Sequence, residues 1–547
     1  MNRNRMIAFF IALCLAMPLA GYSAQPAADA DSKLVSVTAY GRIKGTIDGA
    51  TGTLVWKGVP FAKPPVGELR WRAPQEPVRW TGIRDTIETA EKCIQPSGGS
   101  EDCLYLDIAR PDSNDILPVY VWIHGGGNSA GSTGNMDQFA AFANIVTVSI
   151  QYRLGPIGCF RHEALSTGDT HEDSGNFALM DQIAALRWVK HNIRSFGGDS
   201  KSITVGGESA GASNTLVLLT VPEAFDLFDR AVVESSGMRT ATDEQARKQS
   251  AGYVKNLGLA STGKALAKDL RSLSADAIIR SKPDGAGFGS VPDGNFVPES
   301  RACAFAKGRY KKMPILMGGN RDEYSAWMLW GGGPKGKWAK LWQVLPGEGD
   351  KAVADILNEA ERKTFALVSS AASRLWQASG IHYPARAMAK FQNNVYVYDF
   401  QWGGTKGTKV EFVLGASHAN ELGYFYYGGE WDWMGQGASI TEENRNARHA
   451  LSNAMATYLA RFIHTGNPNG SAALPVWKPW SNAPAGVKTM NLDASSEPGS
   501  STLKLHMTTR EYLVPEILKE LEASGDAAAL EWVKRTARGT LAVTDCD

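Results

Sequence analysis

Short runs of apolar and β-branched residues recur along the chain and alternate with longer segments of helical length. The runs are 119–123, 145–150, 203–205, 231–233, 315–317 and 395–397. A continuously apolar run of this kind is typical of a strand covered on both faces, and segments such as 177–191 have the spacing of a helix. The pattern predicts an α/β fold with a large, mainly parallel central sheet, helices on both of its faces and long insertions.

The two ends of the chain carry further patterns. Arg3 and Arg5 precede an apolar stretch at 6–20 and a small-residue region that ends at Ala24. This order predicts that residues 1–24 are a signal peptide, with 28–30 as an alternative cleavage region. The stretch is shorter than the roughly 20 residues that span a bilayer, so we expect a secreted or periplasmic protein without a stable membrane anchor.

Residues 25–547 are expected to form a single domain, because neither an internal repeat nor a long low-complexity linker divides them. At the far end, 511–538 is predicted to be a helix with Leu513, Ile517 and Leu521 on one buried face. The glycine-rich patch at 331–337 is expected to be a solvated loop. A formal net charge of +1 gives no overall field that would attract nucleic acid.

The strongest chemical motif is Gly-Glu-Ser-Ala-Gly at 207–211. It follows the predicted strand at 203–205 and precedes the apolar segment 215–219. Strand, sharp turn and helix is the setting of a nucleophile elbow, in which the turn exposes a serine hydroxyl and small flanking residues leave room for crowded backbone. We therefore predict that Ser209 is a nucleophile. A serine hydroxyl needs a base beside it and donors for the oxyanion.

Candidate oxyanion donors lie in His-Gly-Gly-Gly at 124–127, directly after the predicted strand 119–123. Consecutive glycines can turn backbone N–H groups toward one point. The predicted donors are the N–H groups of Gly126, Gly127 and Ala210. The alternative is a glycine-rich turn without a ligand.

Further segments resemble the type-B carboxylesterase/lipase family, which includes the cholinesterases. They are found at 56–65, 101–106, 152–156, 175–176, 181–182 and 196–199. The resemblance spans nearly all of the chain after the signal peptide. It implies an α/β-hydrolase fold and a serine esterase that works through an acyl-enzyme intermediate.

The resemblance also locates the other catalytic residues. The family's acid follows an Asn-x-Asp pattern, which here points to Glu323, and its base follows Gly-Ala-x-His, which points to His418. The order Ser, acid, His is that expected of an α/β-hydrolase. Asp322 is the alternative acid, and His124 is expected to support the glycine loop.

The cysteines give a second set of expectations. Family positions and export imply a disulfide between Cys93 and Cys103, while Cys159 is expected to be a buried free thiol and a pairing of Cys303 with Cys546 stays open. The residues between Cys93 and Cys103 include no aromatic one, which disfavours cholinesterase activity. So short a loop also disfavours a large lipase lid.

Departures from the family suggest a substrate class. Asn128 stands where relatives have an aromatic residue, Asn214 where many have serine, and Lys335 and Lys337 follow the acid, as does Lys340. These residues suggest a carboxylate-bearing ester, as cleaved by fumonisin-type esterases. The alternatives are a broad-specificity carboxylesterase, a lipase or, remotely, a non-catalytic adhesion module.

No cofactor is expected, since the chain has neither metal-ligand spacing nor a phosphate-binding glycine pattern. The expected partner is a small ester, and the sequence specifies no oligomeric state.

Overall fold

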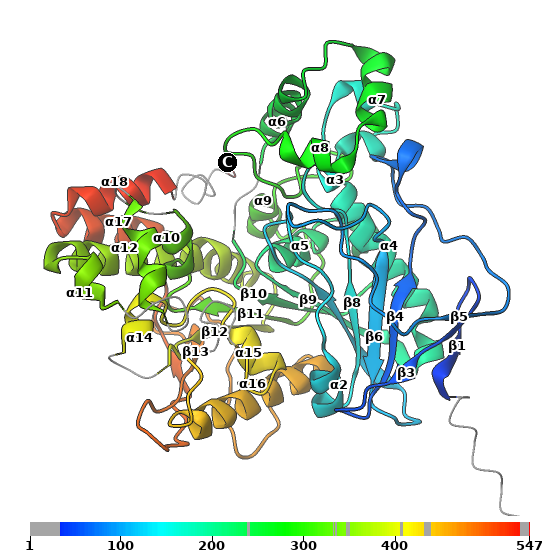
Figure 1. The fold of residues 1–547 in the computed structure, drawn as a ribbon. Coiled ribbons are helices and arrows are strands. Elements are labelled where there is room, and N and C mark those ends of the chain that lie inside the picture. Colours follow the sequence, from blue (N-terminus) through cyan, green and yellow to red (C-terminus); the bar gives the residue numbers. More distant parts are fainter. Residues whose placement is uncertain are drawn as a thin grey trace, which may run out of the picture.

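The computed structural model describes residues 33–237, 241–331, 333, 336–345, 351–404, 408–431, 439–536 and 546. An eleven-stranded sheet crosses the molecule and helices pack on both of its faces (Figure 1). Its strand order is β14-β13-β12-β11-β10-β9-β7-β8-β6-β4-β3. The predicted α/β fold with a large, mainly parallel sheet is confirmed. The predicted signal peptide, 1–24, lies outside the described residues.

Seven neighbouring strands of this sheet are parallel. Each of the six apolar runs that predict strands lies within one of these strands, except that the run 145–150 begins one residue before its strand, and the strands extend beyond the runs by up to five residues. The seven strands are β8 (Val146–Ile150), β7 (Leu117–Ile123), β9 (Gly198–Glu208), β10 (Arg230–Glu234), β11 (Ile315–Asn320), β12 (Val395–Phe400) and β13 (Thr489–Leu492).

Antiparallel strands flank the parallel ones. They are short or interrupted by polar residues such as Lys57 and Asp107, so the apolar pattern does not predict them. They are β14 (His506–Thr508), β6 (Tyr105–Arg110), β4 (Leu54–Pro60) and β3 (Thr46–Ile47). A separate small sheet contains β1 (Val35–Val37), β2 (Arg42–Lys44) and β5 (Ile83–Asp85).

Successive side chains of the central strands enter two different cores, as the two-residue period of a strand requires. On β7, Val119, Val121 and Ile123 pack into one core, whereas Tyr120 and Trp122 pack into the other. Helices α4 (Phe177–Asn192) and α5 (Ala210–Leu218) belong to the first core. The second contains α2 (Asp137–Ala143), α15 (Glu421–Tyr426) and α16 (Arg445–Thr465). Helices therefore cover both faces.

The other helices lie mainly in insertions between strands. Figure 1 shows α6 to α8 projecting from the top of the molecule and α10 to α12 grouped with α17 and α18 on the left. Their bounds are α3 (Gly155–Gly158), α6 (Asp243–Asn256), α7 (Gly263–Ser272), α8 (Ala275–Arg280), α9 (Arg301–Ala306), α10 (Ser325–Gly331), α11 (Val353–Ile356), α12 (Glu359–Gln377), α13 (Tyr383–Met388) and α14 (Lys409–Val413).

The single helix expected at 511–538 is wrong. The segment forms two helices, α17 (Val514–Ala523) and α18 (Ala527–Thr536), because Gly525 between them has a left-handed φ of 72° that ends the first helix. Ile517 and Leu521 are buried as predicted. They belong to a third apolar cluster that α17 and α18 share with α12.

Two disulfides join described residues. Cys93 pairs with Cys103, as the family resemblance implies, and Cys303 pairs with Cys546, a pairing that the sequence leaves open. Cys159 is a free thiol in a half-buried residue. The sulfur itself lies in the interior, and this burial raises the pKa of the thiol to about 12. None of the helices in the described ranges is long and apolar enough to cross a membrane.

Candidate active site

The carboxyl ends of the central parallel strands meet at one edge of the sheet. Ile123 at the end of β7 lies opposite Gly207 of β9, and Glu208 at the end of β9 lies opposite Glu234 of β10. Ligands of open α/β sheets bind at this edge, where the strand order reverses. Here β8 and β9 lie on opposite sides of β7, so the reversal occurs at β7.

Ser209 occupies the turn between β9 and α5. Its φ is 56° and its ψ is −116°, and its N–H donates to the carbonyl of Glu234 at 2.8 Å. The flanking glycines are required by the close approach of β7, because a Cβ at Gly207 would lie 2.5 Å from the Ile123 carbonyl oxygen and one at Gly211 would lie 1.9 Å from it. The local sequence therefore has the strained geometry of an elbow.

The glycine loop after β7 lies against this turn. A Cβ at Gly125 would lie 2.6 Å from a carboxylate oxygen of Glu208 and 3.2 Å from the Ser209 Cβ, so any larger residue would have to displace these groups. Gly126 and Gly127 have φ of 96° and 64°. Within the described chain, no acceptor engages the N–H groups of Gly126, Gly127 or Ala210. These three groups belong to the two segments that meet at Ser209.

His418 and Glu323 form a buried pair. Nδ1 of His418 lies 2.5 Å from Oε2 of Glu323, and the other carboxylate oxygen accepts from the N–H of Asn320 at 2.8 Å. The side chains are 2% and 0% exposed. This geometry fixes the imidazole orientation and leaves Nε2 as the nitrogen that can exchange a proton with a substrate-side group.

The alternative acid, Asp322, points elsewhere. Its carboxylate pairs with Arg321 and accepts from the N–H of Ala416 at 2.9 Å. It thereby links the segment after β11 to the loop that contains His418. Asn320 adds a second link, since its side-chain amide donates to the Ser417 carbonyl at 2.8 Å. Thus the structure brings Glu323 to His418 and uses Asp322 to hold the loops together.

Sequence reasoning missed one residue of this cluster, Glu208. Its Oε1 lies 3.0 Å from Nε2 of His418. Glu208 is the unspecified position of the Gly-x-Ser-x-Gly motif, so only its place directly before Ser209 could have drawn attention to it. Glu421 and Glu234 are two further buried carboxyl groups nearby.

These carboxylates change the pKa of the histidine. Burial by itself lowers the pKa of His418, but the neighbouring Glu208 and Glu323 outweigh burial and raise it to about 9. Burial raises the pKa of Glu208, as does repulsion from Glu421 and Glu323. His418 and Glu208 therefore share a proton-binding site in which protonation of one depends on the other.

Two tryptophans enclose the histidine. The rings of Trp327 and Trp376 lie with their centroids 5.4 Å from that of His418. Trp376 also packs on Gly237, where an added Cβ would come within 3.2 Å of the indole. The two indole rings therefore shield one side of the His418–Glu323 pair from water.

The residues expected to bind substrate have other partners. Asn128 is 5% exposed and its side-chain oxygen Oδ1 accepts from the side-chain amide of Asn214 at 2.8 Å, so the two departures from the family pair with each other. Lys337 forms an ion pair with Glu361. Lys335 lies outside the described residues. His124 stacks on Tyr152 at 4.4 Å, and burial lowers its pKa to about 4, as expected of a neutral structural histidine.

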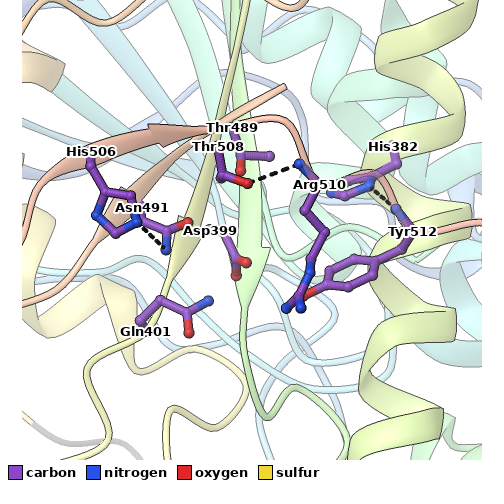
Figure 2. Close-up of a pocket in the computed structure, with 9 residues that line it drawn as sticks. All are labelled: His382, Asp399, Gln401, Thr489, Asn491, His506, Thr508, Arg510 and Tyr512. Carbon is purple, nitrogen blue, oxygen red and sulfur yellow. Dashed lines mark hydrogen bonds between the residues drawn. The ribbon is translucent and has the colours of Figure 1, made fainter. Parts of the chain in front are cut away.

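A polar pocket of about 280 Å³ lies away from these residues, at the β12–β14 end of the sheet (Figure 2). Its lining alternates with core residues along the strands, because Thr489 and Asn491 face the pocket whereas Met490 and Leu492 face the second core. It contains none of the predicted catalytic residues. In the parts that the structure describes, no group of three or more His, Cys, Asp or Glu side chains could hold a metal ion.

Comparisons with known proteins agree with this geometry. The carboxylesterase family profile matches residues 31–510. Para-nitrobenzyl esterase of Bacillus subtilis is 34% identical over 473 residues, which cover 80% of this chain and 91% of that protein. Fumonisin B1 esterase of Sphingopyxis macrogoltabida is 38% identical over 310 residues, 54% of this chain and 57% of that protein.

Solved structures lead to the same family. The crystal structure of a Geobacillus stearothermophilus carboxylesterase aligns with a TM-score of 0.68 at 30% identity and covers 87% of this chain and 97% of that one. A para-nitrobenzyl esterase structure aligns with a TM-score of 0.67 at 28% identity. With a family match over most of its length and esterases among its relatives in both sequence and structure, the chain belongs to the carboxylesterase family of hydrolases.

Proposed function

We propose that the protein hydrolyses carboxylic esters with Ser209 as nucleophile, His418 as general base and Glu323 as the carboxylate that orients the histidine. The observation that carries the proposal is the buried contact of 2.5 Å between His418 and Glu323. Nε2 of the same imidazole lies 3.0 Å from Glu208, the residue that directly precedes Ser209 on its strained turn.

The reaction has two steps. In the first, Ser209 Oγ bonds to the carbonyl carbon while its proton moves to Nε2 of His418, and the bond to the leaving alcohol breaks as the alcohol takes that proton. In the second, water attacks the acyl-enzyme and gives a proton to His418. The bond to Ser209 then breaks, the serine recovers the proton and a carboxylic acid leaves.

The negative charge that develops on the carbonyl oxygen needs donors. The N–H groups of Gly126, Gly127 and Ala210 are proposed for this role. Loss of one such donor typically costs about 2.7–4 kcal/mol of transition-state stabilisation. Glu323 stays ionised throughout and stabilises the imidazolium.

Three substitutions test the assignment. Ser209→Ala and His418→Ala should each lower kcat/KM for a p-nitrophenyl ester by about 10⁴ or more, because nucleophile and base act as a unit. Glu323→Gln should cost less. Circular dichroism establishes that each variant is folded. Residual activity of Ser209→Ala within tenfold of the parent would contradict the nucleophile assignment, and turnover by the parent excludes a non-catalytic adhesion module.

The substrate class has two candidates. The match to the Fumonisin B1 esterase supports esters of polycarboxylic acids, and the longer match to the Para-nitrobenzyl esterase supports a broad-specificity carboxylesterase. Hydrolysis of esters that vary in acyl length, acyl charge and alcohol size distinguishes them. A strong jump in activity at an oil interface would instead favour a lipase.

We also propose that residues 1–24 direct export and that 25–547 form the mature, single-domain enzyme. The two disulfides support this, since such bonds persist in oxidising compartments. Amino-terminal sequencing of the mature protein tests it, and retention of Met1 would contradict it.

A further inference from the structure

Arg301 is a buried cation near the proposed nucleophile. It is the first residue of α9, and its side chain is 3% exposed. One terminal nitrogen donates to the carbonyl of Ser213 at 2.8 Å and the other to the carbonyl of Gly237. Nε is buried without a hydrogen-bond partner.

Within the described chain, no carboxylate forms an ion pair with Arg301. The three other described arginines that are at most 4% exposed do have one: Arg153 lies 2.7 Å from Asp181, Arg70 contacts Glu101 and Arg448 contacts Glu430. Burial lowers the pKa of Arg301 to about 10, and no acidic group offsets that shift. An unpaired buried charge destabilises a fold, so a buried arginine with an unpartnered nitrogen and no carboxylate beside it is a candidate for binding an anion.

Both of its carbonyl partners lead directly to the active site. Ser213 lies one helical turn after Ser209, and its N–H donates to the Ser209 carbonyl at 3.0 Å. Gly237 packs on Trp376, whose ring lies 5.4 Å from that of His418. The guanidinium therefore connects the nucleophile helix to the wall beside the base.

A hydroxyl lies at the same place. Ser213 is partly exposed, and its Oγ lies 3.0 Å from the Gly237 carbonyl and 3.1 Å from Oγ of Ser236. A hydroxyl of this kind can turn its proton toward an anion while the positive charge behind it favours that anion.

We propose that Arg301 and Ser213 form a subsite for a carboxylate on the acyl part of the ester. The inference rests on the proposed function and names its substrate class. The acyl side is favoured because Ser213 lies one turn along the helix that follows Ser209, and the acyl group stays bound to Ser209 after the alcohol has left. Arg301 thus takes the place of Lys337 as the proposed source of positive charge, since Lys337 already pairs with Glu361.

A charge-matched pair of esters provides the test. Monoethyl glutarate carries an acyl carboxylate, and ethyl glutaramate is its neutral amide analogue. A charged hydrogen bond retained in the transition state should give the parent at least about a tenfold higher kcat/KM for the anionic ester. Arg301→Met should bring the ratio of the two kcat/KM values close to one, and Arg301→Lys should keep part of the preference.

Matched controls separate this effect from general damage. Arg110 is another buried arginine that donates to carbonyls, those of Phe196 and Ser113, and Arg110→Met should leave the ratio unchanged. Lys337→Met should do the same. If Arg301→Met does not fold, Ser213→Ala takes its place, because it removes the hydroxyl but keeps the backbone carbonyl that binds Arg301, and it should also lower the ratio.

Each result has one meaning. Equal turnover of both esters by the parent, or a ratio that survives both Arg301→Met and Ser213→Ala, would overturn the subsite but leave the esterase intact. Turnover of p-nitrophenyl esters without turnover of the anionic ester would also overturn the subsite. Failure of the parent to hydrolyse all of these esters, p-nitrophenyl esters included, would instead overturn the proposed function.

Discussion

At the scale of single residues, the proposed mechanism makes proton binding at His418 decide the pH at which the enzyme is active. A general base must be neutral, and the carboxylate of Glu208 at 3.0 Å favours the charged imidazolium. The raised pKa of His418 follows from this contact and from Glu323, against the opposing effect of burial.

Glu208→Gln should move the acid limb of the kcat/KM profile to lower pH. Removing a carboxylate beside His418 removes stabilisation of the imidazolium, so its pKa falls and the neutral base forms at lower pH. A pH profile for a neutral ester measures the shift. Asp322→Asn is the control, because Asp322 contacts Arg321 and Ala416 and should leave the limb in place. If the acid limb of Glu208→Gln stays at the parent's pH or moves to higher pH, the assigned coupling between Glu208 and His418 is contradicted.

Local motifs in the sequence predict Ser209 and the glycine loop because each is complete within a few neighbouring residues. Assignment of Glu323 and His418 needed the family resemblance, because a carboxylate and a histidine so far apart in the chain carry no local signal. The contacts of Glu208 and Arg301 could not be predicted. Glu208 meets His418 across 210 positions of the chain, and Arg301 meets Ser213 across 88.

At the scale of elements, the elbow depends on how closely α5 approaches β7. Gly211→Ala should lower the stability by about 1–3 kcal/mol, because the new methyl group would lie 1.9 Å from the Ile123 carbonyl oxygen and must push the helix away. Urea unfolding measures this loss, and activity should fall as Ser209 is displaced. Gly49→Ala meets no atom within 4 Å and serves as the control. Equal stability of the two variants would show that the contact is relaxed in solution.

The polar end of the sheet makes a separate prediction. Burial raises the pKa of Asp399, on β12, to about 7. A carboxyl group whose pKa is higher in the folded than in the unfolded chain favours folding at low pH, and this stability is lost as pH rises through about 4 to 7. Asp399→Asn should therefore raise the melting temperature at pH 8.5, by an amount that corresponds to at most about 4 kcal/mol.

The same substitution should have a much smaller effect near pH 4, where Asp399 is protonated in the folded chain and only about half ionised in the unfolded chain. A melting temperature that falls at pH 8.5 would show that the ionised Asp399 is paired in the folded protein.

At the scale of the whole molecule, the apolar pattern predicts the central strands of the sheet but neither their order nor the edge strands. The strands from β7 to β12 are apolar because helices cover them on both faces, and this burial makes them recognisable in the sequence. The antiparallel strands are short and partly polar. Their position in the sheet therefore depends on hydrogen bonding to neighbouring strands and cannot be recognised from an apolar run in the sequence. The pairing of Cys303 with Cys546 likewise could not be predicted, because only the complete fold brings together two cysteines that are 243 positions apart.

The cysteines allow a direct count. If export removes Cys14 and both disulfides form, the mature chain should show one free thiol in denaturant, that of Cys159, and five after reduction. A thiol titration with and without reductant measures both values. Three free thiols before reduction would mean that one of the bridges is absent in the isolated protein.

The central claim is that ester hydrolysis proceeds through an acyl-enzyme on Ser209. Diisopropyl fluorophosphate phosphorylates an activated serine and releases fluoride, so the parent should gain one adduct per chain with complete loss of esterase activity. Peptide mapping should place that adduct on Ser209, and Ser209→Ala should gain none. An adduct on another residue, or full activity in a parent chain labelled at Ser209, would contradict the claim.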